Sequence, residues 1–136
     1  MVPAILADTN QIKEVLWNVF LNAVESMPNG GVISFRISIE KPSQKLNKKE
    51  ISIKGLAQTY PDYLMVSITD QGCGISEFQM KKIMDPFVSF KDNGIGLGLS
   101  IVSQIMKSHN GQIKINSSPG KGTCLKLLFP LIKQEN

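Results

Sequence analysis

The sequence is poor in cysteine, in aromatic residues and in long apolar runs. Its two cysteines, Cys73 and Cys124, belong to no CxxC motif or Cys/His cluster, so we expect reduced packing residues and not metal ligands. The longest apolar run, LLFPLI, is far too short to cross a membrane, and no secretory leader opens the chain. These absences predict a cytoplasmic domain without direct membrane contact, although a longer protein containing it could be membrane-anchored.

What the chain does contain fits one ordinary globular domain. Its 136 residues are 42% hydrophobic and 19% charged, which predicts a single unit over residues 1–136 with a core at about 5–132. The formal net charge is +4, and much of the excess lies in the polar stretch EKPSQKLNKKE, which has no aromatic residue. A solvated loop explains that stretch better than a nucleic-acid surface, so no nucleic-acid partner is expected.

A strong amphipathic helix is predicted over residues 9–27. Apolar residues recur there with the i, i+3, i+4, i+7 spacing of one helical face: Ile12, Val15, Leu16, Val19, Phe20, Ala23, Val24 and Met27. Asp8 is suited to cap the N-terminus, and the turn sequence PNGG ends the helix. The next stretch, 32–40, alternates apolar and polar residues and predicts a half-buried strand.

The remaining elements complete an α+β pattern. A long polar connection at about 41–62, in which ISI suggests a short strand, leads to a strand at 63–70. A short helix follows Ser76, which stands at capping-box spacing from Gln79. After an irregular stretch come a helix and two strands, with the apolar helix residues Leu99, Ile101, Val102, Ile105 and Met106 facing inward. We predict a two-layer sandwich: one mixed, mostly antiparallel sheet with helices packed on one face.

Two asparagines on the first helix are candidates for a binding site. Asn18 and Asn22 are four residues apart, so their side chains lie on one line of the helix. Asn22 falls about 90° from the centre of the apolar stripe, at its border, from which an amide can reach a site beside the core. Two solvent-facing polar residues would give the same pattern.

The stretch DQGCGI places an acid at the end of a predicted strand. Asp70 is followed by Gly72 and Gly74, which is compatible with a tight turn bearing a solvated carboxylate. The alternative is a fixed hydrogen-bond acceptor, beside which glycines let a flat ligand lie against the backbone. An adenine amino group is a suitable donor to such an acceptor, whereas guanine presents a carbonyl at the same position.

The stretch KDNGIGLGLSIV carries three alternating glycines in front of a helix. Backbone N–H groups that no Cβ atom hinders, at a helix N-terminus, form a natural anion cradle. Other glycine motifs do not fit. The only Gly-Lys pair is followed by Gly122 and not by Ser or Thr, as a Walker A motif requires. The spacing is GxGxG and not the Rossmann GxGxxG, and the companion motifs of eukaryotic-type protein kinases are missing.

Taken in order, these motifs resemble the catalytic ATP-binding domain of bacterial two-component sensor histidine kinases, a branch of the Bergerat-fold ATPases. NVFLNA is similar to the N box of that family, DQGCGI to its G1 box, DPFVSF to its F box and GIGLGLSIV to its G2 box. SSPGKGTCLKLLFP is similar to its closing hairpin. The resemblance extends over roughly residues 5–132, and its motifs are specific as a set.

The resemblance implies ATP and Mg²⁺ as cofactors and assigns residues to each. Asn22 would be the metal ligand, and Asn18 a supporting catalytic residue one turn earlier. Asp70 would bind the adenine amino group, in a pocket shaped by Gly72, Gly74, Ile75 and Thr123. An ATP lid at about 85–98 would contribute Phe87 and Lys91, and the phosphates would be wrapped by Gly94, Gly96, Leu97, Gly98 and Leu99.

Several positions depart from the pattern of the family. Glu25 stands where a basic residue often follows the metal-binding asparagine, which puts a phosphate contact there in doubt. Ile95 replaces the threonine of GTGLGL, and Val88 and Phe90 replace a common tyrosine and threonine. The connection at 41–62 is long for the family. None of these departures removes Asn22 or Asp70.

The phosphoacceptor of such a kinase is not found in this chain. The sole histidine, His109, stands at a predicted helix end, where we expect a structural role. The resemblance therefore implies transfer of the γ-phosphoryl group of ATP to a histidine on a separate dimerisation domain, which then serves a cognate response regulator. The isolated domain is expected to be a monomer, and the full-length kinase a homodimer.

Three rival functions remain open from the sequence. Related ATP hydrolases such as gyrase and MutL carry a water-activating glutamate where this chain has Asn18, so we expect slow intrinsic hydrolysis. A related protein-serine kinase acting on an anti-sigma partner is the second rival. The third is a nucleotide-binding module without catalysis.

Overall fold

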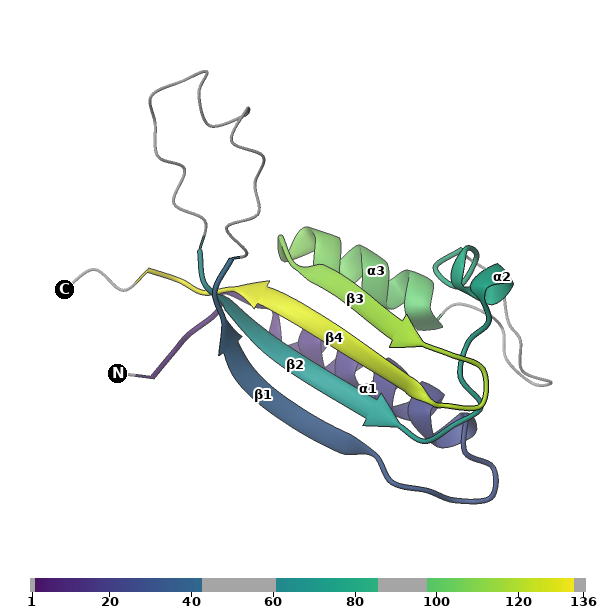
Figure 1. The fold of residues 1–136 in the computed structure, drawn as a ribbon. Helices are drawn as coiled ribbons and strands as arrows, with labels where there is room; N and C mark the ends of the chain where they lie inside the picture. The colour runs from purple at the N-terminus through teal and green to yellow at the C-terminus, as the bar shows by residue number, and fades with distance from the viewer. Residues whose placement is uncertain (1, 43–60, 86–97, 134–136) are drawn as a thin grey trace, which may run out of the picture.

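Three helices and four strands form the part of the chain that the computed structural model describes, residues 2–42, 61–85 and 98–133 (Figure 1). In chain order they are α1 Thr9–Glu25, β1 Ser34–Glu40, β2 Tyr63–Asp70, α2 Glu77–Met80, α3 Gly98–Ser108, β3 Gln112–Ser117 and β4 Thr123–Pro130. The predicted short strand at ISI lies outside the described residues. Each of the other predicted elements is present, with ends shifted by a few residues.

The strands form one open sheet in the order β1-β2-β4-β3, and every pairing among them is antiparallel. The mostly antiparallel sheet that we predicted is therefore confirmed, with no parallel pair among these four strands. Both longer helices lie behind the sheet in Figure 1, on the same face. This is the two-layer α+β sandwich expected from the order of elements.

The ends of α1 follow from local hydrogen bonds. Asp8 caps the helix as predicted, because its Oδ1 accepts from the backbone N–H of Gln11 at 2.9 Å. The helix ends at Glu25, two residues before the predicted end, and Ser26 forms its C-cap. The capping box of α2 is also confirmed, since both reciprocal bonds between Ser76 and Gln79 are present.

The core lies between the sheet and the two longer helices. Its buried members come from α1, α3, β2 and β4: Val15, Val19, Ile68, Val102, Ile105, Met106, Leu125, Leu127 and Phe129. Two members of the apolar stripe of α1 lie outside this core, since Phe20 and Val24 are 36% and 42% exposed. These two residues lie on the border of the stripe towards β1.

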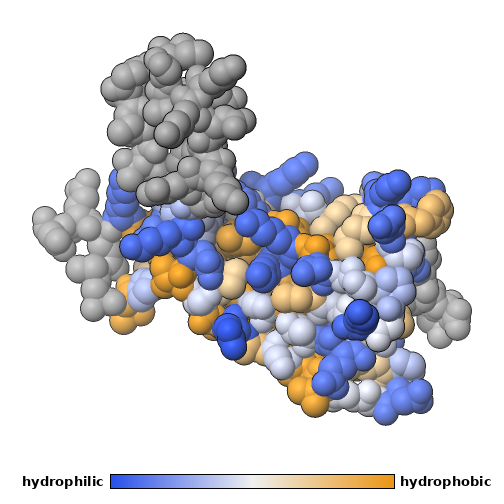
Figure 2. Space-filling model, in the orientation of Figure 1, coloured by the Kyte–Doolittle hydropathy of each residue, from blue (hydrophilic) through white to orange (hydrophobic). Residues whose placement is uncertain are grey.

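β1 is far more exposed than the half-buried strand that we predicted. Phe35, Ile37 and Ile39 point to the helix side of the sheet, yet they remain 54%, 69% and 43% exposed. The reason is the position of β1 at the edge, since α1 packs on β2 and α3 and does not cover the outermost strand. Figure 2 shows the opposite face of the sheet, away from the helices, where small hydrophobic spots are mixed with hydrophilic surface.

The two cysteines are both free, but only one packs as predicted. Cys124 is half-buried and lies 3.7 Å from Ser67 Oγ, whereas Cys73 is exposed in the loop after β2. None of the helices within residues 2–42, 61–85 and 98–133 combines the length and hydrophobicity that crossing a membrane requires.

Because Leu127 is fully buried, Leu127→Ala should lower the free energy of unfolding by about 2–5 kcal/mol through the lost contacts and the cavity left behind. The matched control is Leu6→Ala, since Leu6 is 84% exposed and should change stability little. Urea denaturation followed by circular dichroism measures both. Equal losses for the two variants would contradict the core described above.

Candidate nucleotide-binding site

Three motifs of the sequence converge at one end of the sheet. The C-terminal end of β2, the first turn of α3 and the second half of α1 all lie at this end in Figure 1. Asp70 is the last residue of β2, and Gly98 is the first residue of α3. The fold therefore gathers residues that are far apart in sequence, since Asn22 precedes Asp70 by 48 positions and Gly98 follows it by 28.

The two asparagines of α1 face the start of α3. A Cβ atom built on Gly98 would lie 3.4 Å from Asn18 Oδ1, 3.7 Å from Asn22 Nδ2 and 3.8 Å from Asn22 Oδ1. Asn18 donates its Nδ2 hydrogen to the carbonyl of Glu14 at 2.9 Å. Its Oδ1 therefore points away from that carbonyl, on the side of Gly98. Both side chains are half-buried, as the border position on the helix predicted.

Asp70 is held by backbone N–H groups on one oxygen. Its Oδ1 accepts from Gly72 N at 2.8 Å and from Thr123 N at 3.2 Å. The side chain is only 9% exposed, so these two bonds compensate for part of the lost hydration of the carboxylate. Because both bonds use the same oxygen, Oδ2 is the atom that can accept from a ligand.

The loop after β2 packs directly on the end of α1. Cys73 N donates to the carbonyl of Ser26 at 3.3 Å, and Ser26 N in turn donates to the carbonyl of Asn22 at 3.1 Å. A Cβ on Gly72 would collide with Ser26 Oγ, and one on Gly74, where φ is +72°, would collide with the carbonyl oxygen of Ser118. These glycines are thus required by contacts within the protein, whereas the sequence had suggested close approach by a ligand.

Ser117 links the two sides of the Asp70 site and was missed in the sequence. Its Oγ accepts from Ile75 N at 2.8 Å and donates to the carbonyl of Gly122 at 2.8 Å. Thr123 Oγ1 lies 2.8 Å from the same oxygen, so the threonine must donate there, and its lone pairs are left to accept from a ligand or water. A serine at a strand end gives no signal in a single sequence that could have revealed this role.

Part of the predicted site lies outside the described residues. Phe87, Lys91, Gly94, Gly96 and Leu97 fall in the stretch 86–97, of which the structure gives no description. The predicted lid at about 85–98 belongs largely to that stretch. Leu99 is described, and it is a half-buried residue packed against the core. Its side chain therefore supports the first turn of α3.

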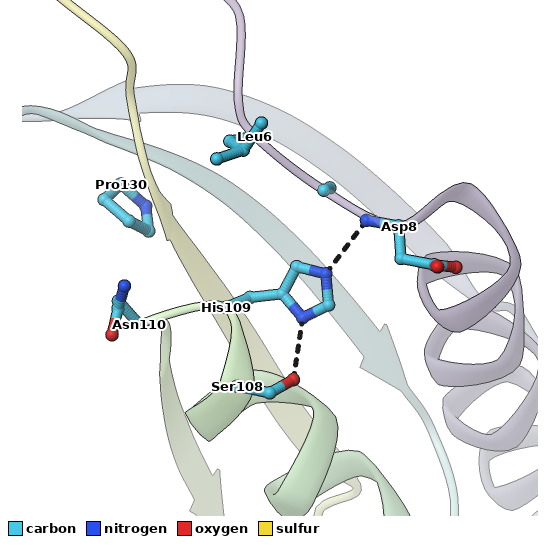
Figure 3. A pocket seen from close by; sticks show the side chains of 7 residues that line it. Leu6, Asp8, Ser108, His109, Asn110 and Pro130 are labelled. Carbon is cyan, nitrogen blue, oxygen red and sulfur yellow. Dashed lines mark hydrogen bonds between the residues drawn. The ribbon is translucent and has the colours of Figure 1, made fainter.

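His109 is engaged through both ring nitrogens, in agreement with a structural role. It lines a hollow of about 370 Å³ between the start of α1 and the end of α3 (Figure 3). The backbone N–H of Asp8 donates to Nε2 at 3.1 Å, so the hydrogen must sit on Nδ1, which faces the carbonyl of Ile105 at 2.8 Å. This hollow is at the opposite end of α1 from Asn22 and belongs to the packing of the two helices.

The fold, together with the Asp70 and Asn22 motifs, defines a Bergerat-type ATP-binding domain, and the comparisons with known proteins agree. The family model described as histidine kinase-, DNA gyrase B- and HSP90-like ATPase matches residues 7–133. The chain belongs to this family of ATPases.

A curated relative of the chain is a kinase. Sporulation kinase E of Bacillus subtilis (strain 168) is 34% identical over 130 residues, which cover 96% of this chain and 15% of the relative. The chain thus spans less than a fifth of the length of that protein, so the likeness concerns one domain of it.

Two solved structures share the fold. The mycobacterial sensor histidine kinase MprB superposes with a TM-score of 0.72 at 23% identity, covering 97% of this chain and 78% of that one. Full-length ShkA, solved in complex with AMPPNP, gives a TM-score of 0.70 at 24% identity over 99% of this chain and 24% of that one. Both likenesses concern the arrangement of the backbone.

Gly74→Ala should destabilise the protein more than Gly120→Ala. Both glycines have positive φ, +72° and +75°, so each alanine is strained by about 1–2 kcal/mol. Only the Gly74 variant adds a collision with the Ser118 carbonyl, because nothing lies within 4 Å of a Cβ on Gly120. Urea denaturation of both variants measures the difference. Equal destabilisation would contradict the close packing of the loop after β2.

Proposed function

We propose that this chain is the catalytic ATP-binding domain of a sensor histidine kinase. It binds Mg-ATP and transfers the γ-phosphoryl group to a histidine imidazole on a separate dimerisation domain. A bond forms between the imidazole nitrogen and phosphorus while the bond to the leaving ADP oxygen breaks. The observation that carries the proposal is the contact of the Asp70 loop with the end of α1, which brings an adenine acceptor and the asparagine pair to one end of the sheet.

The adenine end of the site rests on Asp70 Oδ2. Since Oδ1 is held by two backbone N–H groups, the carboxylate has a fixed direction in which it can accept. The exocyclic amino group of adenine is a donor suited to that oxygen, and the Thr123 hydroxyl offers a second acceptor beside it. Guanine would face Asp70 with a carbonyl, so selectivity for ATP over GTP is expected.

The phosphate end rests on the asparagines and the start of α3. An amide oxygen is a hard ligand of the kind that Mg²⁺ accepts, and Asn22 lies beside the first residue of α3. The N-terminus of that helix favours negative charge, and Mg²⁺ bound there would neutralise charge on the phosphates. Asn18 supports the same place from one turn earlier.

Slow hydrolysis of ATP is part of the proposal. An amide at position 18 cannot take a proton from water at neutral pH, so the hydrolase mechanism lacks its base there. Glu14 lies a further turn away, is exposed, and offers its backbone carbonyl to Asn18. Transfer to an imidazole needs no base if the ring attacks through its lone pair. The proposed partners are a response regulator and a dimerisation domain that bears the acceptor histidine. Both would be in the cytoplasm.

Asp70→Asn should weaken ATP binding at least about 10-fold while leaving the fold intact. The asparagine can keep its oxygen on Gly72 N and Thr123 N, which places a donor where Oδ2 was and opposes the adenine amino group. Calorimetric titration with ATP measures the loss, and Asp62→Asn, at an exposed acid, is the matched control. Unchanged affinity with native stability would contradict the adenine role.

Asn22→Ala, and likewise Asn22→Asp, should reduce transfer at least about 100-fold, because the metal ligand is lost or altered. The assay supplies Mg-ATP and a histidine dimerisation domain from a matched kinase, and it follows label that is lost in acid, as expected for phosphohistidine. Asn29→Ala, in an exposed turn, is the control. Acid-stable label would favour the serine-kinase alternative, and binding without any transfer by the unaltered protein would favour a non-catalytic module.

A further inference from the structure

An apolar surface lies on the side of α1 that faces away from the candidate nucleotide site. We name it the β1–α1 face, formed by Trp17, Phe20, Val24, Phe35, Ile37 and Ile39. The ring centroids of Trp17 and Phe20 are 6.2 Å apart, and those of Phe20 and Phe35 are 6.4 Å apart with the rings stacked. These contacts join the helix and the edge strand into one surface.

The size of this surface calls for an explanation. Its six side chains are between 36% and 69% exposed, which corresponds to an apolar area on the order of 500 Å² if full areas are roughly 150–250 Å² for such residues. Contiguous apolar areas of that size on a soluble protein commonly mark a contact with another molecule.

The edge of β1 has few of the usual devices against pairing, since its only charged residues are Arg36 and Glu40. The strand runs over seven residues, SFRISIE, without a proline or a lysine, and its pairing with β2 is continuous and without a bulge. Among the described strands β1 pairs with β2 alone, so its other edge presents backbone N–H and C=O groups. Such an edge is a template for a further strand.

We propose that β1 pairs antiparallel with β1 of a second copy of this chain, about a two-fold axis at Ile37, so that the two sheets become one of eight strands. The strand is self-complementary in this arrangement, which a two-fold interface requires. On the helix side Ile37 faces Ile37 of the second copy, and Phe35 faces Ile39 of the second copy. On the other side Arg36 lies opposite Ser38 of the second copy and diagonal to its Glu40, twice over, within reach of long side chains. The two Arg36 side chains are also diagonal to each other, so the two opposite-charge contacts outnumber one like-charge contact.

Other registers are less favourable. A slip of one residue would bring the apolar side of one strand opposite the polar side of the other and place the helices on opposite faces. A slip of two residues, to an axis at Ser38, brings Arg36 directly opposite Glu40 of the second copy but pairs only five of the seven residues. The axis at Ile37 uses the whole strand.

The helices fit the same arrangement. With α1 packed over β2, the two copies of α1 would be separated by three strand spacings, about 14 Å. Helices in direct contact lie about 8–10 Å apart. The remaining gap lies over the paired β1 strands, and Trp17 and Phe20 from both copies point towards it and would fill it.

The pairing should be weak for the isolated domain. The apolar area is below the ~800 Å² per partner of a standard stable interface, so a monomer is expected at low concentration and a dimer at high concentration. In a protein that holds two copies together, the effective concentration reaches roughly the millimolar range and the paired state would predominate. The inference does not depend on the proposed kinase function.

Sedimentation velocity from micromolar to millimolar concentration tests the pairing. Ile37→Lys should abolish the dimer, because two cations would face each other at the axis. Ile37 is 69% exposed in the monomer, so folding should be unaffected. Ile132→Lys, at another exposed apolar residue outside the β1–α1 face, should leave the dimer unchanged. An unaltered protein that stays monomeric over the whole range would overturn the proposal.

Reversing the charges of Arg36 and Glu40, singly and together, tests the register. Arg36→Glu and Glu40→Arg should each weaken the dimer roughly 3- to 30-fold, since each creates two like-charge diagonals. The double variant restores opposite charges and should recover most of the affinity. A double variant no better than the single ones would overturn the register. Hydrogen-exchange protection of the outer β1 amides in the monomer would also overturn the proposal, because another segment would then occupy the edge.

Discussion

The contact between the loop after β2 and the last turn of α1 sets the geometry of the whole site. Cys73 N bonds to the Ser26 carbonyl, and Gly72 is close enough to Ser26 that no other residue would fit. Since Ser26 is one turn beyond Asn22, this contact fixes the distance between the carboxylate at the end of β2 and the asparagine line of α1.

The fold was accessible to sequence reasoning because its determinants are local and periodic. The apolar spacing in α1, the alternation in β1 and the capping residues Asp8 and Ser76 each act within a few positions. The exposure of β1 was not accessible, because alternation shows which side of a strand is apolar but not whether a helix covers it. That depends on the order of strands, and the outermost position of β1 is a property of the whole sheet.

The candidate site likewise contains features that the sequence could reveal and features that it could not. Asp70 and Asn22 could be named from motifs, since their residue types and order are unusual together. The reason for Gly72 and Gly74 could not be predicted, because the sequence does not show that Ser26 and Ser118 occupy the space where a Cβ would lie. Ser117 was missed for a similar reason: its hydroxyl accepts from Ile75 N and Thr123 Oγ1 and donates to the Gly122 carbonyl only after β3 and β4 have paired.

α1 separates two surfaces with different chemistry. The line of Asn18 and Asn22 borders α3, whereas Trp17, Phe20 and Val24 lie about 140–160° around the helix from Asn22 and border β1. Between them the buried line of Val15, Val19 and Ala23 anchors the helix to the core. A contact on the β1 side can therefore leave the asparagines accessible, and it can also bias how α1 sits on the sheet. Two elements connect the β1–α1 face to the candidate site: this helix, and β2, which pairs with β1 and ends at Asp70.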